Sequence, residues 1–409
     1  MKTFDVPLIY RSPLISAIKQ FRKQEDKLKK DFSPTHLDLG PLQLYLARHF
    51  GFCYGVENAI EIAYRTLDEN PGKRIFLISE MIHNPQVNED LQERGIRFLQ
   101  DTLGKPLLPL SSLTPEDIVI IPAFGTTIPL ENELRNLGLS VERYNTTCPF
   151  VEKVWNRSSQ IATKGYTIVI HGKPKHEETR ATFSRAAAHA PAVIVNDLAD
   201  AARLAQYVTG ERPPEQFKVD FAGKYSPEFS VSRDLRRIGV VNQTTQLASD
   251  TQAIADFLKA TMIRHFQLTP ATIAQHFADT RDTLCYATND NQTAVSEMLQ
   301  TTADLALIIG GYNSSNTTHL VELCENKLPT YFINSDENLL SSEEIHFYNY
   351  SKQQMQQKSS YLPASSPSRI LITSGASCPD ALVERVIRKL AGFFQQEEKL
   401  EEVSARFKS

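Results

Sequence analysis

The chain has 409 residues, 41% of them hydrophobic and 22% charged, and a net charge of -4, which is ordinary for a globular protein of two or three domains. The negative charge argues against general binding to nucleic acid or to anionic membranes, because both need a basic surface. No apolar run approaches the ~20 residues needed to cross a bilayer. Five widely spaced cysteines make a poor disulfide framework and favour a reducing compartment. We expect a cytoplasmic protein, or a plastid stromal one if the first ~45 residues contain a transit peptide.

Short apolar runs rich in β-branched residues recur along the chain, separated by helix-like stretches. Their hydrophobicity is continuous rather than alternating, which is typical of strands covered on both faces. The sequence therefore predicts an α/β fold with parallel or mixed sheets flanked by helices. The predicted strands are 75–79, 117–124, 166–172, 192–197, 237–245, 304–311, 330–334 and 369–377, and the predicted helices are 55–69, 86–95, 129–138, 150–164, 246–261, 290–302, 317–326 and 379–395.

Four segments interrupt this rhythm. Residues 13–31 predict a helix that either packs on the body of the protein or stays mobile. Residues 210–234 and 350–368 are rich in Pro, Gly, Ser or Gln and predict surface insertions or linkers. The last segment, 393–409, predicts the solvated end of an amphipathic helix.

Polar residues gather where the predicted strands end, which in open α/β sheets is where ligands bind. Ser, Thr and Asn supply neutral donors there, and helix N-termini attract phosphate. Helix capping alone explains any single one of them, but five such strand ends favour a site for an anionic small molecule. His176 lies two residues from Glu178, a spacing that suits proton delivery to a leaving group. The residues concerned are His83, His176, Glu178, Thr244, Thr245, Ser314, Ser315, Asn316 and Ser377.

Three cysteines, Cys53, Cys148 and Cys285, each lie in a loop that feeds a predicted helix N-terminus. That position lowers the pKa of a thiol and favours the thiolate. Three thiolates brought together would hold zinc, or an iron–sulfur cluster with one iron left free. The alternative is that all three cysteines are buried and inert, and the spacing alone favours this alternative. Cys324 is expected in the core, and Cys378 is ambiguous.

Eight motifs follow one another along the chain: GFCYGVENAIEIAY, HNPQVNEDL, NTTCPFVEKVW, HGKPKHEETRAT, NQTTQLASDT, CYATNDNQ, GGYNSSNTTHL and TSGASCPDALVE. Together they resemble the 4-hydroxy-3-methylbut-2-enyl diphosphate reductases, the IspH or LytB family, in its plant and cyanobacterial branch. The resemblance runs from about residue 47 to 392. It implies an iron–sulfur oxidoreductase of the non-mevalonate (MEP/DOXP) isoprenoid pathway. Such an enzyme removes the allylic hydroxyl of its substrate with two electrons, giving isopentenyl and dimethylallyl diphosphate.

The resemblance also implies an architecture of three similar α/β domains around a central cavity. Each domain would give one cysteine to a single 4Fe-4S cluster with one open iron. On this basis we expect an N-terminal extension (1–46), domain 1 (47–147, with Cys53), domain 2 (148–281, with Cys148), domain 3 (282–395, with Cys285) and a C-terminal tail (396–409).

Residue roles follow from the same resemblance. Glu178 resembles the proton source, Thr244 the residue that orders hydrogen bonds around the leaving oxygen, and His176 a proton-relay histidine. An external electron donor such as ferredoxin or flavodoxin is implied, with no nucleic-acid or membrane partner. The implied diphosphate ligands are His83, His176, Ser314, Ser315, Asn316 and Ser377, and the implied cluster ligands are Cys53, Cys148 and Cys285.

One position departs from many bacterial members. In the motif PAFGTT, Phe124 stands where those members have a ligand-contacting His. We expect the substrate contacts in that corner to be rearranged or passed to Thr126.

Two other classes of function are also considered. A non-catalytic iron–sulfur or redox sensor on the same scaffold would need neither Glu178 nor Thr244. A cysteine-nucleophile hydrolase or transferase acting on diphosphates would need only one of the three cysteines.

Overall fold

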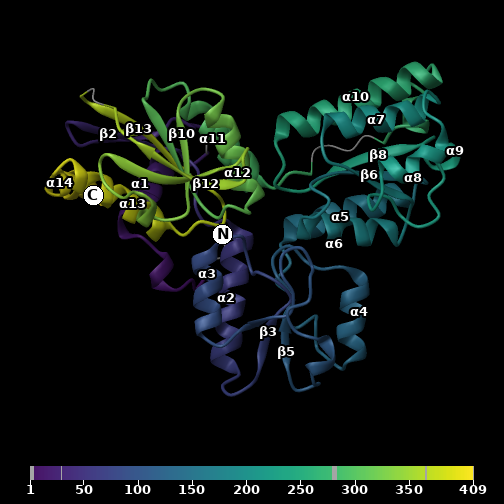
Figure 1. Ribbon diagram of the computed structural model, residues 1–409, viewed down its shortest axis with the longest axis horizontal. Helices are drawn as coiled ribbons and strands as arrows, with labels where there is room; N and C mark the ends of the chain where they lie inside the picture. Colours follow the sequence, from purple (N-terminus) through teal and green to yellow (C-terminus); the bar gives the residue numbers. More distant parts are fainter. Residues whose placement is uncertain (1–3, 29, 279–282, 364–365, 409) are drawn as a thin grey trace. The chain divides into compact units, whose positions relative to one another are not determined.

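The structure, a computed structural model, describes residues 4–28, 30–278, 283–363 and 366–408 (Figure 1). It is an α/β protein whose sheets are flanked by helices, as predicted. The chain forms two compact units. The first unit is Met1–Glu61, His83–Val87 and Tyr286–Ser409, and the second unit is Ile62–Ile82 and Asn88–Cys285.

The predicted helices are confirmed, including the one near the N-terminus. Four further helices, α6, α7, α8 and α9, were not predicted. The helices are α1 (Pro13–Glu25), α2 (Tyr54–Glu69), α3 (Pro85–Glu93), α4 (Ile128–Asn136), α5 (Pro149–Ala162), α6 (Glu177–Ala187), α7 (Leu198–Thr209), α8 (Phe217–Asp220), α9 (Val231–Asp234), α10 (Ala248–Phe266), α11 (Tyr286–Met298), α12 (Ser315–Glu325), α13 (Asp380–Phe393) and α14 (Glu397–Ala405).

The first unit contains a five-stranded sheet in the order β1-β2-β13-β9-β10. All neighbours run parallel except β1, which pairs antiparallel with β2 at one edge. Helix α1 buries Leu14, Ile15 and Ile18 in the core of this unit, so the packed alternative for the N-terminal helix is confirmed. The strands are β1 (Thr35–Asp38), β2 (Leu42–Leu46), β9 (Leu305–Ile309), β10 (Thr330–Ile333) and β13 (Ser368–Ser374).

The second unit contains two parallel three-stranded sheets, in the orders β4-β3-β5 and β7-β6-β8. Strands β6, β7 and β8 are buried along their whole length, which confirms that continuous hydrophobicity marks strands covered on both faces. Helices α7 and α10 cover one face of this sheet, and α5 and α6 cover the other (Figure 1). The strands are β3 (Ile75–Leu77), β4 (Arg97–Phe98), β5 (Ile118–Ile120), β6 (Thr167–His171), β7 (Ala192–Val195) and β8 (Ile238–Asn242).

Two segments that were predicted as surface insertions or linkers have ordered structure. Residues 210–234 do not form a simple linker, because Phe217 and Phe221 are buried against the β7-β6-β8 sheet. Burial of these aromatic side chains favours packed structure more strongly than the local Pro and Gly content favours a linker. Within 350–368, the polar strand β12 (Gln354–Ser359) pairs antiparallel with β11 (Glu344–Asn349), so this part is an ordered hairpin.

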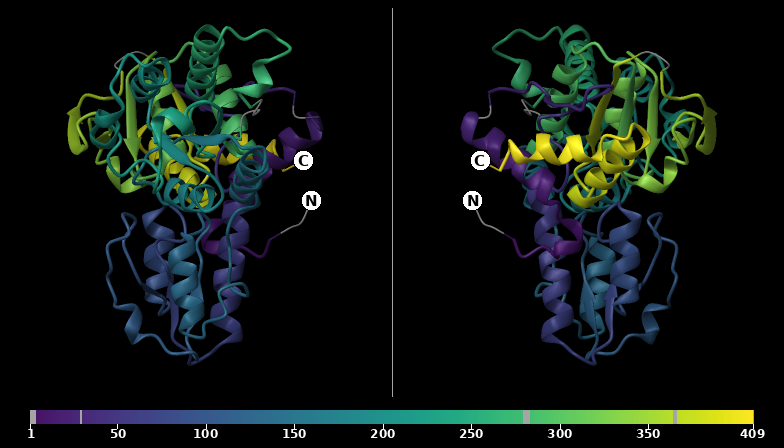
Figure 2. Two further views of the ribbon diagram at one scale, coloured as in Figure 1. Left: turned by 90° about the vertical axis from the view of Figure 1, so that its right-hand side faces the viewer. Right: turned by 90° about the vertical axis from the view of Figure 1, so that its left-hand side faces the viewer.

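The C-terminal helix α14 is amphipathic, as predicted, but it is not simply solvated. It buries Leu400 and Val403 in the core of the first unit. Figure 2 shows α14 beside the N-terminal helix α1. Both chain ends of the first unit therefore contribute to one core.

Candidate functional site

Glu178 and Thr244 form a buried pair in the second unit. Glu178 is the second residue of α6, which follows β6, and Thr244 lies just after β8. The Thr244 amide donates to Glu178 Oε1 at 2.6 Å, and the Thr244 hydroxyl donates to Oε2 at 3.0 Å. The Glu178 side chain is 1% exposed. One residue thus holds both carboxyl oxygens in a fixed orientation.

His176 caps the same helix. Its Nδ1 accepts from the Glu178 amide at 3.2 Å, so in the neutral ring the proton lies on Nε2. The Phe124 ring meets the His176 ring edge-on, with centroids 5.6 Å apart. Phe124 therefore packs against a predicted site histidine.

Gln243 is a site residue that the sequence analysis missed. Its side chain is fully buried, and its Oε1 accepts from the Lys173 amide at 3.2 Å and the Thr179 hydroxyl at 3.0 Å. These bonds tie the loop before Thr244 to the loop and helix that carry Glu178. The indication was its place inside the motif NQTT, between the end of a predicted strand and Thr244.

Two of the three predicted ligand cysteines lie in the second unit. Cys148 is the N-cap of α5, and its amide donates to Ala123 O at 2.9 Å. The Cys285 amide donates to Thr244 O at 3.1 Å, which joins Cys285 to the residue that holds Glu178. Cys285 and Glu178 both lie within electrostatic range of the Cys148 thiol.

The expectation that a helix N-terminus lowers the thiol pKa is wrong for Cys148. Burial is the largest influence and raises the pKa of this thiol to about 11, with Cys285 and Glu178 adding to the increase. Backbone N–H groups of Phe150 and Val151 act in the expected direction but are outweighed. A positive group bound at the sulfur would favour the thiolate.

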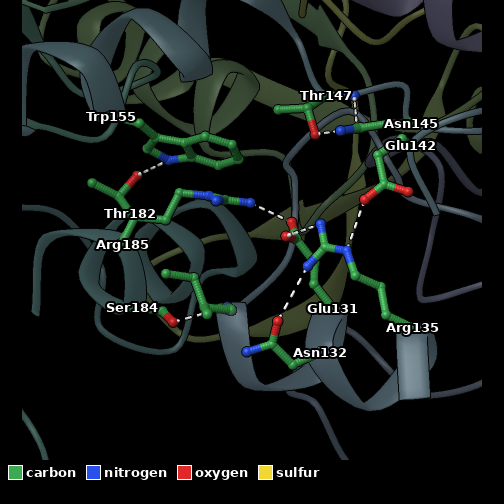
Figure 3. Close-up of polar contacts among 11 residues, drawn as sticks. Glu131, Asn132, Arg135, Glu142, Asn145, Thr147, Trp155, Thr182, Ser184 and Arg185 are labelled. Carbon is green, nitrogen blue, oxygen red and sulfur yellow. Dashed lines mark hydrogen bonds and ion pairs between the residues drawn. The ribbon is translucent and has the colours of Figure 1, made fainter. Parts of the chain in front are cut away.

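A polar network fixes the helices that begin at this site (Figure 3). The Trp155 indole on α5 donates to the Thr182 hydroxyl on α6 at 3.1 Å. The Arg185 guanidinium lies 4.0 Å from the centre of the Trp155 ring and forms an ion pair with Glu131 on α4. Ser184 on α6 accepts from the Ile128 amide of α4 at 3.0 Å. These contacts join α4, α5 and α6 to one another. They therefore hold in place the two helices whose N-terminal ends carry Cys148 and Glu178.

Thr245 lies beside Thr244 in the second unit, where its hydroxyl accepts from Gln243 Nε2 at 2.8 Å. The other predicted polar residues lie in the first unit, three of them at the N-terminus of α12. Ser314 caps this helix, and its hydroxyl accepts from the Thr317 amide at 3.3 Å. Ser315 and Asn316 follow in the first turn, which contains no acidic residue. The amide groups of such a helix end attract anions.

Two other segments join this helix end. Asn316 Oδ1 accepts from the Ala376 amide at 2.9 Å, and the Ser377 hydroxyl donates to His83 O at 3.1 Å. The structure thus links five predicted diphosphate residues from three segments of the first unit, all of them buried. They form a neutral cradle, which we define as His83, Ser314, Ser315, Asn316 and Ser377.

Cys53 also belongs to the first unit. Its amide donates to Ala376 O at 3.2 Å, beside the segment that carries Ser377. Gly51 just before it has φ +79°, which glycine adopts without strain. The rings of Phe52 and Tyr54 pack edge-on against Tyr10 and Phe4.

The donor chemistry fits the implied cluster. Iron–sulfur clusters are held by cysteine thiolates, and Cys53, Cys148 and Cys285 are all partly accessible, whereas Cys324 and Cys378 are fully buried. Cys324 lies in the core as expected, and Cys378 is a core residue too. Among the described residues of either unit, no three His, Cys, Asp or Glu side chains form a group that could hold a metal ion.

These features define an α/β protein with helix-terminal thiols, a neutral anion cradle and a buried carboxyl–hydroxyl pair. A sequence model of the family described as LytB protein matches residues 44–391. The 4-hydroxy-3-methylbut-2-enyl diphosphate reductase of Synechococcus sp. (strain WH7803) is 37% identical over 388 residues, 95% of this chain and 91% of the relative. The same-named protein of Prochlorococcus marinus (strain MIT 9313) is 39% identical over 355 residues, 87% of this chain and 86% of the relative. The chain belongs to the LytB protein family.

Solved structures show the same fold. The E-1-hydroxy-2-methyl-but-2-enyl-4-diphosphate reductase of Plasmodium falciparum matches with a TM-score of 0.60 at 21% identity, covering 85% of this chain and 87% of that chain. A structure of (E)-4-hydroxy-3-methyl-but-2-enyl diphosphate reductase matches with a TM-score of 0.51 at 24% identity, covering 85% of this chain and 98% of that one. In the described part of the chain, every helix is too short or too polar to cross a membrane.

Proposed function

We propose that the chain is a 4-hydroxy-3-methylbut-2-enyl diphosphate reductase of the non-mevalonate isoprenoid pathway. It would remove the allylic hydroxyl of its substrate with two electrons and two protons, giving isopentenyl or dimethylallyl diphosphate and water. Family membership supports the reaction. The observation that carries the chemistry is the Glu178–Thr244 pair, which a protein that only sensed redox state would not need.

The proposed cofactor is one 4Fe-4S cluster held by Cys53, Cys148 and Cys285, with the fourth iron free of protein ligands. When bound, it supplies the two electrons and polarises the substrate hydroxyl. The proposed domains remain 47–147, 148–281 and 282–395, each giving one of these cysteines.

Glu178 is the proposed proton source for the departing hydroxyl. Glu178 Oε2 and Thr244 Oγ1 lie 3.0 Å apart and share one proton in a hydrogen bond. When Glu178 is protonated, it donates in this hydrogen bond, and the Thr244 hydroxyl is then free to donate to the leaving oxygen. The Thr244 amide keeps the carboxyl group from turning away. The pair is buried, so bulk water does not compete for the proton.

The cradle is the proposed diphosphate site, with His176 as a further ligand through its Nε2–H. Hydroxyl, amide and helix N-terminal donors bind an anion without placing fixed cations near a reduced cluster. Electrons would come from an external donor such as ferredoxin or flavodoxin. The proposed location is a reducing compartment, the cytoplasm or the plastid stroma, because five widely spaced cysteines make a poor disulfide framework.

Anaerobic reconstitution of the full chain tests this function. We expect a brown protein with about four irons per chain that turns over the allylic diphosphate with a reduced donor. Alanine substitution of Cys53, Cys148 or Cys285 should each abolish cluster and turnover alike. An iron-free wild type would overturn the proposal, and loss at one cysteine alone would indicate a nucleophile instead.

A further inference from the structure

Thr283, two residues before Cys285, is bound to Asn242 at the end of β8 by hydrogen bonds in both directions. Asn242 Oδ1 accepts from the Thr283 amide at 3.0 Å and from the Thr283 hydroxyl at 2.6 Å. In return, the Asn242 amide donates to the Thr283 hydroxyl at 3.1 Å. Asn242 is 1% exposed and Thr283 5% exposed, so water does not replace these bonds.

A second attachment follows two residues later on both segments. The Cys285 amide donates to Thr244 O at 3.1 Å. Asn242 faces Thr283 and Thr244 faces Cys285, so the chain entering Cys285 runs alongside the chain leaving β8. Thr244 is also the residue that holds Glu178.

The start of β8 holds an earlier part of the same segment. Ile238 pairs in parallel with Phe277, through the Ile238 amide to His276 O and the Ala278 amide to Ile238 O, both at 2.9 Å. Gly239 allows this approach, because an added Cβ there would lie 3.0 Å from the Ala278 Cβ. The described residues on this path are therefore attached at the start of β8 and again at its end.

The Asn242 side chain uses both of its polar atoms in this arrangement. While Oδ1 holds Thr283, Nδ2 donates to Gln243 O at 3.0 Å. The amide group is thereby fixed in one orientation and cannot rotate without breaking bonds on both sides. A leucine or valine at this position would fill the space but leave the buried Thr283 amide without an acceptor.

We propose that Asn242 and Thr283 form a clamp that positions the Cys285 thiol relative to the Glu178–Thr244 pair. They are positioning residues, acting through Cys285 and Thr244 rather than on substrate. This inference rests on the proposed function, in which Cys285 is a cluster ligand. If Asn242 and Thr283 only stabilised the fold, weakening the clamp would speed alkylation of every cysteine and lower the melting temperature. If they position Cys285, weakening the clamp speeds alkylation of Cys285 selectively.

The test compares Thr283→Val, which keeps the branched shape but removes the hydroxyl, with Thr283→Ser, which keeps the hydroxyl. The full chain without cluster is treated with iodoacetamide, and the alkylation rate of each cysteine is read by peptide mass spectrometry. We expect Thr283→Val to speed alkylation of Cys285 by at least about fivefold relative to Cys148, because local opening becomes easier. Thr283→Ser should keep the wild-type ratio. An unchanged ratio in Thr283→Val, or equal acceleration of all thiols, would overturn the clamp.

A second measurement uses the anaerobically reconstituted chain. Thr283→Val should change the electron paramagnetic resonance signature of the reduced cluster, and Thr283→Ser should restore it. An identical signature in all three proteins would also overturn the inference. If the wild type takes up no iron, the proposed function fails, and the alkylation ratio still decides whether the clamp holds Cys285.

Discussion

The two groups of polar residues are built on different principles. In the second unit, a single titratable side chain, Glu178, is held at both oxygens by one partner, Thr244. In the first unit, the cradle spreads its neutral groups over three segments around the N-terminus of α12. The first arrangement fixes one proton at one place, and the second distributes an anion over many weak donors. Loss of a single group should therefore cost far more in the second unit than in the first.

Replacing Glu178 by Gln should have the largest effect. Gln keeps the shape but has no acidic proton, so kcat should fall about 10²- to 10⁴-fold, with iron content unchanged. Anaerobic steady-state kinetics measure this. The matched control is Glu177→Gln, a buried neighbour that accepts from the Ser79 hydroxyl. Equal losses in both variants would indicate damage to α6 rather than loss of the proton source.

A cradle substitution should act mainly on binding. Ser377→Ala removes one donor out of several, so KM should rise about tenfold while kcat changes little. Ser374→Ala, at the last residue of β13 and outside the cradle, serves as the control and should leave KM unchanged. A drop in kcat as large as that of Glu178→Gln would remove the distinction between the two groups.

Phe124 tests how firmly the second-unit site is held. Phe124→Leu removes the edge contact with His176, worth about 0.5–1.5 kcal/mol, so kcat/KM should fall about two- to tenfold. Phe124→Tyr keeps the ring and should stay near the wild-type value. If Leu and Tyr behave alike, the ring contact does not orient His176.

The smallest effect should come from the helix base. Trp155→Phe loses the bond to Thr182, about 1 kcal/mol, which should lower the melting temperature by about 2–4 °C. Thr182→Val removes the other end of the same bond. The double variant should lose less than the sum of the two single losses, because the bond can be lost only once. Fully additive losses would show that the two side chains act separately.

Most of the fold could be predicted because strands covered on both faces have continuous apolar runs, as β6 and β9 do. Helix α6 was missed because its first turn, HEET, is polar and was interpreted only as a strand-end loop. The β11–β12 hairpin was missed because its second strand is almost entirely exposed and carries no apolar pattern.

The site could be predicted only in part. The residue types at the strand ends indicated an anion site, but Glu178 and Thr244 are 66 residues apart, and nothing local in the sequence pairs them. The raised pKa of Cys148 depends on burial and on Cys285 and Glu178, which are distant from it in the sequence. A rule about helix N-termini could therefore not predict it. The roles of individual residues came from the family motifs rather than from spacing.

Product analysis tests the central claim most directly. The anaerobically loaded wild-type chain is given the allylic diphosphate and a reduced donor, and products and consumed electrons are counted together. We predict isopentenyl and dimethylallyl diphosphate, with two electrons consumed for each product molecule. A loaded chain that leaves the substrate intact, or that releases phosphate instead, would contradict the account.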